Sequence, residues 1–263
     1  MANGNYRYGQ QSINLAAPKK YKLRKYKKLG AKTWIISFII ILVPAIPAAI
    51  YINWRFYFQN TITADGVPDY SKEMSSSIES GPVQIRLDGY RESGEYKGRK
   101  LDITFKDYYD ITGIVVSVHD YWGFNAYDAL VPRDVCVIWG NLANNYPSPG
   151  LEFSQADRYC KPKIDGVELS DEETFTTRSK MGVKMTGIST FSNNHLISST
   201  PEIRGQIFGL SAGNRVRIVG YLVRVSYDGI VLDSSETRED AGDHACEVMY
   251  VTSIKNLPGN KAR

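Results

Sequence analysis

The sequence predicts a mainly β protein of the α+β type, with an N-terminal transmembrane helix before a small extracytoplasmic β-barrel and one or two short helices. Three observations carry this prediction. The first is an uncharged, largely apolar run from Trp34 to Ile52. The second is a series of short runs after residue 82 that are rich in β-branched residues and bounded by turn residues. The third is a strand-length segment whose apolar face changes sides at Gly220.

The N-terminal region differs from the rest of the chain in charge. Residues 1–58 contain ten Lys/Arg and no acidic residue, a charge of +10, whereas residues 59–263 contain 22 Lys/Arg and all 28 acidic residues, a charge of −6. Eight of the basic residues lie at 19–32, directly before the apolar run. A helix rises about 1.5 Å per residue, so this run covers most of a ~30 Å hydrocarbon layer. The positive-inside rule then places the N-terminus in the cytoplasm.

These observations divide the chain into five parts. We expect a basic cytoplasmic tail at 1–33, a transmembrane helix at 34–54, a juxtamembrane linker at 55–82, an extracytoplasmic β-rich domain at 83–258 and a short tail at 259–263. A cleaved signal peptide is the alternative, but the apolar run and the segment before it are both longer than is typical. The chain has no Asn-x-Ser/Thr sequon, which favours a bacterial inner membrane with the domain in the periplasm.

The apolar run also indicates partners. Pro44 and Pro47 predict a local bend in the helix. Ala45 and Ala49 form a small-xxx-small pair that permits close helix contact, so a homo-oligomer is a hypothesis. The basic tail can attract anionic membrane lipid in addition to fixing the topology.

The first half of the expected domain reads as short strands. Alternating or β-branched runs occupy 83–87, 100–105, 110–122 and 134–140, with Gly113 as a bend or bulge. Asn193 and Asn194 suit a turn, because asparagine tolerates left-handed backbone conformations.

The clearest elements follow residue 199. Thr200 predicts the N-cap of a helix that starts at Pro201, with Ile203, Ile207 and Leu210 on one face. A long strand is expected from Asn214. Turn residues at 228–229 predict a hairpin that returns through 230–235, and a final strand is expected from 246 to 254.

The long strand, with its glycine-centred change of face and its hairpin, resembles the first strand and hairpin of an OB-like barrel. A second resemblance rests on WG (139–140), SNNHLI (192–197), VRIVGYLV (216–223) and SSETREDAGDHACEVMYV (234–251). Together these segments are similar to an uncharacterised group of bacterial single-pass membrane-anchored envelope proteins. The resemblance implies a cell-envelope location and no known activity.

The three cysteines leave the redox state open. One disulfide with one free thiol and three buried thiols both fit the sequence. Cys136 and Cys246 lie in apolar strand-like runs, which suggests burial, and Cys160 looks loop-like. At least one thiol is therefore predicted to be free but inaccessible.

Residues 234–251 hold most of the reactive side chains. A nucleophilic site would take Cys246 as thiolate with His195 or His244 as base. No glycine-bounded nucleophile motif supports it. No spacing typical of metal ligands occurs among the His, Cys and acidic residues, so no metal and no cofactor are predicted. The sequence favours a loop in which Arg238 pairs with neighbouring acids.

The remaining patterns favour binding over catalysis. Nucleic acid is not expected as a partner, because the domain carries −6. The leading hypothesis is a periplasmic binding or scaffolding module that contacts an envelope protein. One alternative is a sugar- or peptidoglycan-binding OB-like domain, for which 119–128 and 144–150 supply aromatic and amide side chains. The other is an enzyme that uses His195, His244 and Cys246.

Overall fold

The computed structural model describes residues 44–46, 60–122, 125–168, 190–236 and 246–258. The chain divides into two units, 1–51 and 52–263, and the description below concerns the second. Most of the predicted membrane span lies outside the described residues; within it, 44–46 are helical. No helix among the described residues combines the length and the apolar character needed to cross a membrane.

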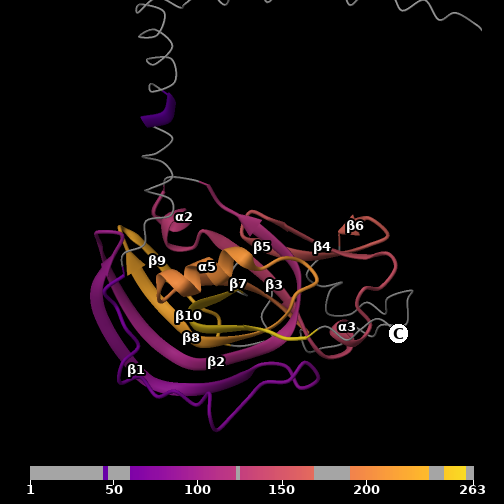
Figure 1. Ribbon diagram of the computed structural model, residues 1–263, viewed down its shortest axis with the longest axis horizontal. Helices are drawn as coiled ribbons and strands as arrows, with labels where there is room; N and C mark the ends of the chain where they lie inside the picture. The colour runs from indigo at the N-terminus through magenta and orange to yellow at the C-terminus, as the bar shows by residue number, and fades with distance from the viewer. Residues whose placement is uncertain (1–43, 47–59, 123–124, 169–189, 237–245, 259–263) are drawn as a thin grey trace, which may run out of the picture. The chain divides into compact units, whose positions relative to one another are not determined.

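The second unit is mainly β, and five of its strands pair in a closed ring (Figure 1). These strands are β2 (Arg99–Asp120), β3 (Arg133–Ile138), β7 (Phe191–Ser198), β8 (Arg215–Tyr227) and β10 (Glu247–Asn256). The pairings run β2–β3, β3–β7, β7–β10, β10–β8 and β8–β2. Only β7 and β10 are parallel, and the other four ring pairs are antiparallel. A sheet closed in this way has no free edge around the ring.

The structure differs from the sequence interpretation of the strands in two respects. The Gly220 strand is β8, the fourth of the ring strands along the chain and not the first. The runs at 100–105 and 110–122 belong to one continuous strand of 22 residues, β2, which is the first ring strand. Register shifts near Asp107 and Val116 bend this strand on either side of Gly113. At Gly113 itself a Cβ would lie 2.3 Å from the Ile138 carbonyl oxygen, so the glycine permits close approach of β3.

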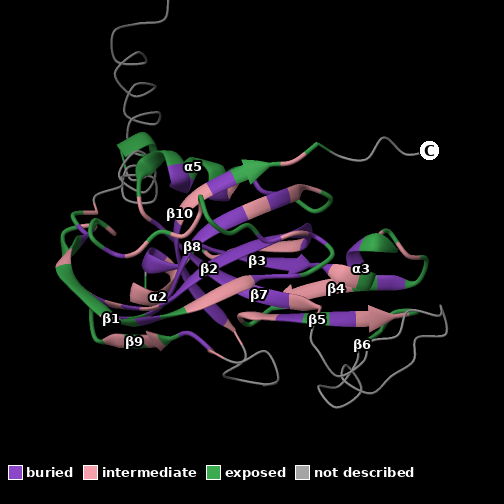
Figure 2. Ribbon diagram, turned by 90° about the horizontal axis from the view of Figure 1, so that it is seen from below, coloured by how far each residue is buried: buried purple, intermediate pink, exposed green. Residues whose placement is uncertain are grey.

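The ring strands are buried over much of their length (Figure 2), and they share one apolar core cluster. All five strands contribute to it, among others through Val115, Val135, Val137, Leu196, Ile218 and Met249. Helix α5 (Pro201–Gly209) adds Ile203 and Ile207 to the same cluster, and Leu210 follows directly after the helix. The predicted helix and its buried face are therefore confirmed.

Both ends of α5 are held by side chains. The Thr200 hydroxyl accepts a hydrogen bond from the Ile203 amide at 3.2 Å, as a Thr N-cap should. At the other end, one guanidinium nitrogen of Arg133 donates to the carbonyl oxygens of Ile207, Phe208 and Leu210. The Asp120 carboxylate accepts two hydrogen bonds from Arg133 at 2.6 and 2.8 Å and so fixes its orientation.

The change of face at Gly220 is confirmed. Val216, Ile218 and Leu222 lie in the cluster inside the ring, whereas Val219, Tyr221, Val223, Val225 and Tyr227 lie in a second buried cluster. A Cβ at Gly220 would lie 2.1 Å from the backbone oxygen of Tyr250, so only glycine allows β10 to approach β8 this closely. The expected turn after β8 is also present, with Asp228 and Gly229 both at positive φ.

Further elements surround the ring. β1 (Val83–Tyr96) pairs with β2, and the short β9 (Ile230–Asp233) pairs with β8. β4 (Leu151–Ala156), β5 (Tyr159–Ile164) and β6 (Val167–Glu168) form a separate three-stranded sheet. Helices α2 (Ala126–Leu130) and α3 (Gly140–Asn144) each have five residues. Residues 60–82, interpreted as linker from their composition, bury Ile62, Val67 and Ile78 in the apolar clusters.

The predicted turn at Asn193 and Asn194 was wrong. Both residues lie within β7, and both are buried. The Asn194 amide donates to the carbonyl oxygens of Val135 and Ser192, and the Asn193 amide donates to the Arg158 carbonyl at 2.6 Å. These side chains find partners on neighbouring segments, so the tertiary environment overrides the local preference of asparagine for turns.

Candidate functional site

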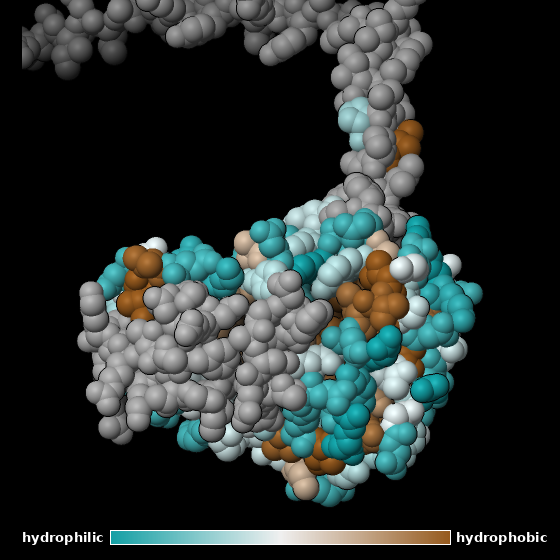
Figure 3. Space-filling view, turned by 180° about the vertical axis from the view of Figure 1, so that it is seen from behind, coloured by the Kyte–Doolittle hydropathy of each residue, from teal (hydrophilic) through white to brown (hydrophobic). Residues whose placement is uncertain are grey.

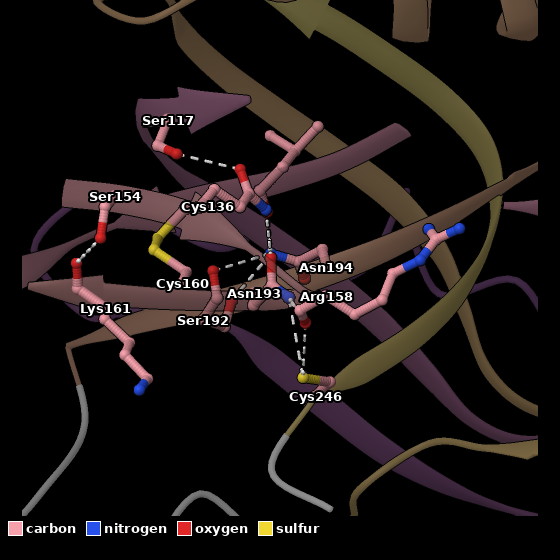
Figure 4. Close-up of a disulfide and its surroundings, with 12 residues drawn as sticks. Ser117, Cys136, Ser154, Arg158, Cys160, Lys161, Ser192, Asn193, Asn194 and Cys246 are labelled. Atoms are coloured by element: carbon pink, nitrogen blue, oxygen red, sulfur yellow. Dashed lines mark hydrogen bonds between the residues drawn. A yellow bond between two sulfur atoms is a disulfide. The ribbon is translucent and has the colours of Figure 1, made fainter. Parts of the chain in front are cut away.

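The cysteines form one disulfide and one free thiol. Cys136 of β3 is bonded to Cys160 of β5, and Cys246, just before β10, is free (Figure 4). The sequence left two redox states open, and the structure shows one disulfide with one free thiol and not three buried thiols. Cys160 lies in a strand and not in a loop. Cys246 was expected to be buried, but it is partly exposed, because the apolar strand begins only after it.

His195 is held by a buried carboxylate. It lies directly opposite Asp134 in the β3–β7 ladder, and the His195 Nδ1 atom is 2.8 Å from the Asp134 Oδ1 atom. Asp134 is completely buried, and only 4% of the surface of His195 is exposed. Because Nδ1 is committed to Asp134, Nε2 is the ring nitrogen left for another partner.

The charge of His195 follows from these neighbours. Burial by itself would lower the pKa of the imidazole, but the Asp134 carboxylate and then the Cys246 side chain outweigh it and raise the pKa to about 9. His195 is therefore expected to be protonated at neutral pH. The effect of Cys246 on the histidine also shows that thiol and imidazole lie within interaction range.

The Cys246 sulfur is positioned by two further groups. It accepts a hydrogen bond from the Asn193 amide at 3.7 Å and donates to the Arg158 carbonyl at 3.6 Å (Figure 4). Asn193 and His195 are two residues apart in β7, so their side chains lie on the same face of the sheet. The sequence placed Asn193 in a turn and therefore gave no sign of this arrangement.

Arg158 completes the cluster, and the sequence gave it no role. It occupies the turn between β4 and β5 with φ +69°. Its guanidinium pairs with Asp128 and lies 3.1 Å from Asp134. The guanidinium carbon also lies 3.3 Å from the ring centre of Tyr121 and 4.1 Å from that of Tyr127. The only sequence signal is an Asp-Arg pair (157–158) between two short polar runs, which is typical of many turns.

These side chains border a small pocket. It is lined by Tyr127, His195, Val231, Leu232, Asp233, Cys246 and Val248, and its volume is about 160 Å³. Pockets that hold drug-sized ligands usually measure about 300–1,000 Å³, so this one accommodates only a small group. The pocket contains a thiol, an imidazole and a carboxylate next to three aliphatic side chains. Such a lining suits a small ligand that carries a polar group at the end of an apolar group.

The structure brings together two of the three candidate site residues. His195 and Cys246 border the same pocket. His244 lies outside the described residues, and so do Arg238 and the acids next to it that were predicted to pair. Glu236, directly before that segment, forms salt bridges with Arg86 of β1 and Lys106 of β2. His119 does not line the pocket; it lies opposite Asp134 in the β2–β3 ladder and packs against Tyr121, with the ring centres 4.6 Å apart.

The His, Cys, Asp and Glu side chains of the described residues do not indicate a metal site. Across the described ranges, no group of three or more His, Cys, Asp or Glu side chains is arranged to hold a metal ion. Comparison of the chain with protein-family models, with curated proteins and with solved structures gave no match.

Proposed function

We propose that the chain is a single-pass protein of the bacterial inner membrane whose periplasmic domain is an OB-like barrel that binds an envelope protein. The five-stranded ring, with one parallel pair, supports the OB-like assignment. The basic tail and the apolar run support an N-terminus in the cytoplasm, held against anionic lipid. The disulfide supports an oxidising compartment for the domain.

The topology has a simple test. Alkaline phosphatase fused after Arg263 should be active, because it folds only in an oxidising compartment. Green fluorescent protein exported through the same pathway should be dark at that position. The opposite pattern would place the domain in the cytoplasm and contradict this part of the proposal.

The binding function rests on one observation, the pocket beside β9. In OB-like barrels the second and third strands carry the ligand face. Here these are β3 and β7, which hold Asp134 and His195. Three consecutive residues of β9 form the opposite wall of the pocket. Among the described residues β9 pairs only with β8, so its outer edge can accept an extended peptide.

Three of the tyrosines in the two aromatic segments favour a protein partner over a sugar. A sugar site needs aromatic faces that are open to the ligand. Of the aromatic side chains at 119–128 that prompted the sugar hypothesis, Tyr121 and Tyr127 both have the Arg158 guanidinium over a ring face, whereas Trp122 is 53% exposed. Tyr146 of the second aromatic segment packs against a buried cluster. Apolar surface elsewhere occurs as limited patches between hydrophilic ones on the face in Figure 3. The binding site is therefore expected to be small and centred on β9.

The register of β9 gives a sharp test. In a two-residue hairpin, Tyr227 and Ile230 form the hydrogen-bonded pair next to the turn, so the backbone of Val231 points away from β8. Replacing Val231 by proline removes that outward N–H and keeps the β8–β9 hydrogen bonds. Val231→Ala shortens the side chain and keeps the N–H.

The experiment uses full-length protein in cells with a photo-crosslinking residue at Leu232, which lines the pocket. A control variant carries the crosslinker at Val167, an exposed position in β6. We expect a discrete protein adduct from Leu232 and none from Val167. Adding Val231→Pro should abolish the adduct, and adding Val231→Ala should leave it. Equal adducts at Leu232 and Val167, or capture of peptidoglycan fragments instead of protein, would contradict the proposal.

A further inference from the structure

The face formed by β3, β7 and the start of β10 carries three groups that belong together chemically. Asp134 orients His195 through Nδ1 at 2.8 Å, and His195 shares a pocket with the free thiol of Cys246. The three residues come from three adjacent segments: Asp134 and His195 are 61 positions apart, and α5, β8 and β9 lie between His195 and Cys246 in the chain. A carboxylate, an imidazole and a thiol in this order form the arrangement that activates a cysteine nucleophile.

We propose that Cys246 is a nucleophile that attacks the carbonyl carbon of a small acyl donor and carries the acyl group as a thioester. His195 is the group that pairs with the thiolate and transfers protons, and Asp134 is a positioning residue that acts through His195. The proposal shares the pocket of the binding function, but it needs neither the membrane anchor nor a protein partner.

A disulfide between Cys246 and Cys136 does not fit the sheet. Cys136 lies opposite Asn193 in the β3–β7 ladder, and Cys246 lies on the far side of Asn193. Adjacent strands are about 4.8 Å apart, so two spacings separate Cys136 and Cys246 by roughly 10 Å. Disulfides need Cα atoms within about 7 Å. Cys246 is therefore not placed to pair with Cys136, and it is the one free thiol among the described residues.

The surroundings of Cys246 suit this role. The thiol is partly exposed, so a substrate can reach it, whereas His195 and Asp134 are buried behind it. The imidazole is expected to be protonated at neutral pH, with a pKa of about 9, and it lines the same pocket as the thiol. The pocket of about 160 Å³ admits a short acyl group and excludes a bulky one.

The reaction balances without a further reagent. The sulfur forms a bond to the carbonyl carbon, the bond from that carbon to the leaving group breaks with its electron pair, and His195 gives a proton to the leaving group. Water then attacks the thioester, His195 takes a proton from it, and the acid and the thiolate are released. No oxidant or reductant takes part.

The first test measures alkylation of Cys246 by iodoacetamide in the full-length protein. At about pH 6.5 an ordinary thiol is only about 1% thiolate, given a pKa of about 8.5. We expect native protein to react at least ~10-fold faster than the same chain unfolded in denaturant with its disulfide intact. His195→Gln should remove this excess, and Asp88→Asn, at an exposed position in β1, should keep it.

The second test uses p-nitrophenyl acetate as the acyl donor. The wild-type chain should release a burst of about one p-nitrophenolate per chain and carry one acetyl group on Cys246. Cys246→Ser removes the free thiol, keeps the disulfide and should give no burst. If His195→Gln fails to fold, the comparison of native with unfolded protein and the Cys246→Ser result still decide. Native alkylation no faster than in the unfolded chain, equal bursts from wild type and Cys246→Ser, or reaction only with a disulfide probe would overturn the proposal.

Discussion

Replacing Asp134 by asparagine is expected to lower the free energy of unfolding at pH 7 by about 3 kcal/mol, within the range for breaking a buried ion pair by removing one partner. Asp134 is completely buried and faces two cationic side chains, His195 at 2.8 Å and Arg158 at 3.1 Å. Asparagine keeps the shape of the side chain but not its charge. His195 must then lose its proton, and Arg158 keeps only Asp128.

Thermal unfolding followed by circular dichroism measures this effect. In a domain of about 200 residues, 3 kcal/mol corresponds to a fall in Tm of roughly 6–12 °C. Asp88→Asn removes the same charge from an exposed position and should change Tm by less than about 1 °C. If Asp134→Asn were as stable as Asp88→Asn, the carboxylate would not be holding the two cations together.

The stability of the wild-type protein is expected to fall between about pH 6.5 and pH 9. The pKa of His195 is near 6.5 in the unfolded chain and about 9 in the folded protein. Between these values the folded protein binds the extra proton, so the contribution is complete below pH 6.5 and is lost as the pH rises through 9. The difference corresponds to about 3 kcal/mol.

Urea unfolding at intervals across this range checks the prediction. The curve for His195→Gln should be nearly flat over the same interval, because glutamine does not titrate. The penalty of Asp134→Asn should also shrink toward pH 9.5, where His195 is neutral in both proteins. A wild-type stability that stays constant or rises from pH 6.5 to 9 would contradict the assignment of a protonated His195.

Local signals predicted the elements that depend on neighbouring residues. The Thr200 cap, the Asp228-Gly229 turn and the change of face at Gly220 each follow from the conformational preferences of a few adjacent residues. The closed ring needs pairings between strands that are far apart in the chain, such as β2 with β8. No periodicity within either strand specifies such a pairing, so no strand order was predicted, and the Gly220 strand was likened to the first barrel strand although it is the fourth.

Only part of the candidate site could be predicted, because the rest also depends on pairings between distant strands. The sequence singled out His195 and Cys246 from their residue types alone. It could not supply Asp134, because the pair with His195 spans 61 positions and depends on the register of β3 with β7. Arg158 was missed because its role depends on a left-handed turn that places its guanidinium between two tyrosines. An isolated arginine after an aspartate carries no such information.

The most direct test of the central claim is a titration of the three histidine side chains by NMR in the full-length protein. Imidazole signals from ¹⁵N-labelled histidine report protonation, and the His195 signal is identified by its loss in His195→Gln. The account predicts that His195 stays protonated through pH 7.5 and titrates near 9, and that Asp134→Asn lowers this pKa. A His195 that titrates at or below about 6.5, the ordinary value for a histidine, would contradict the account.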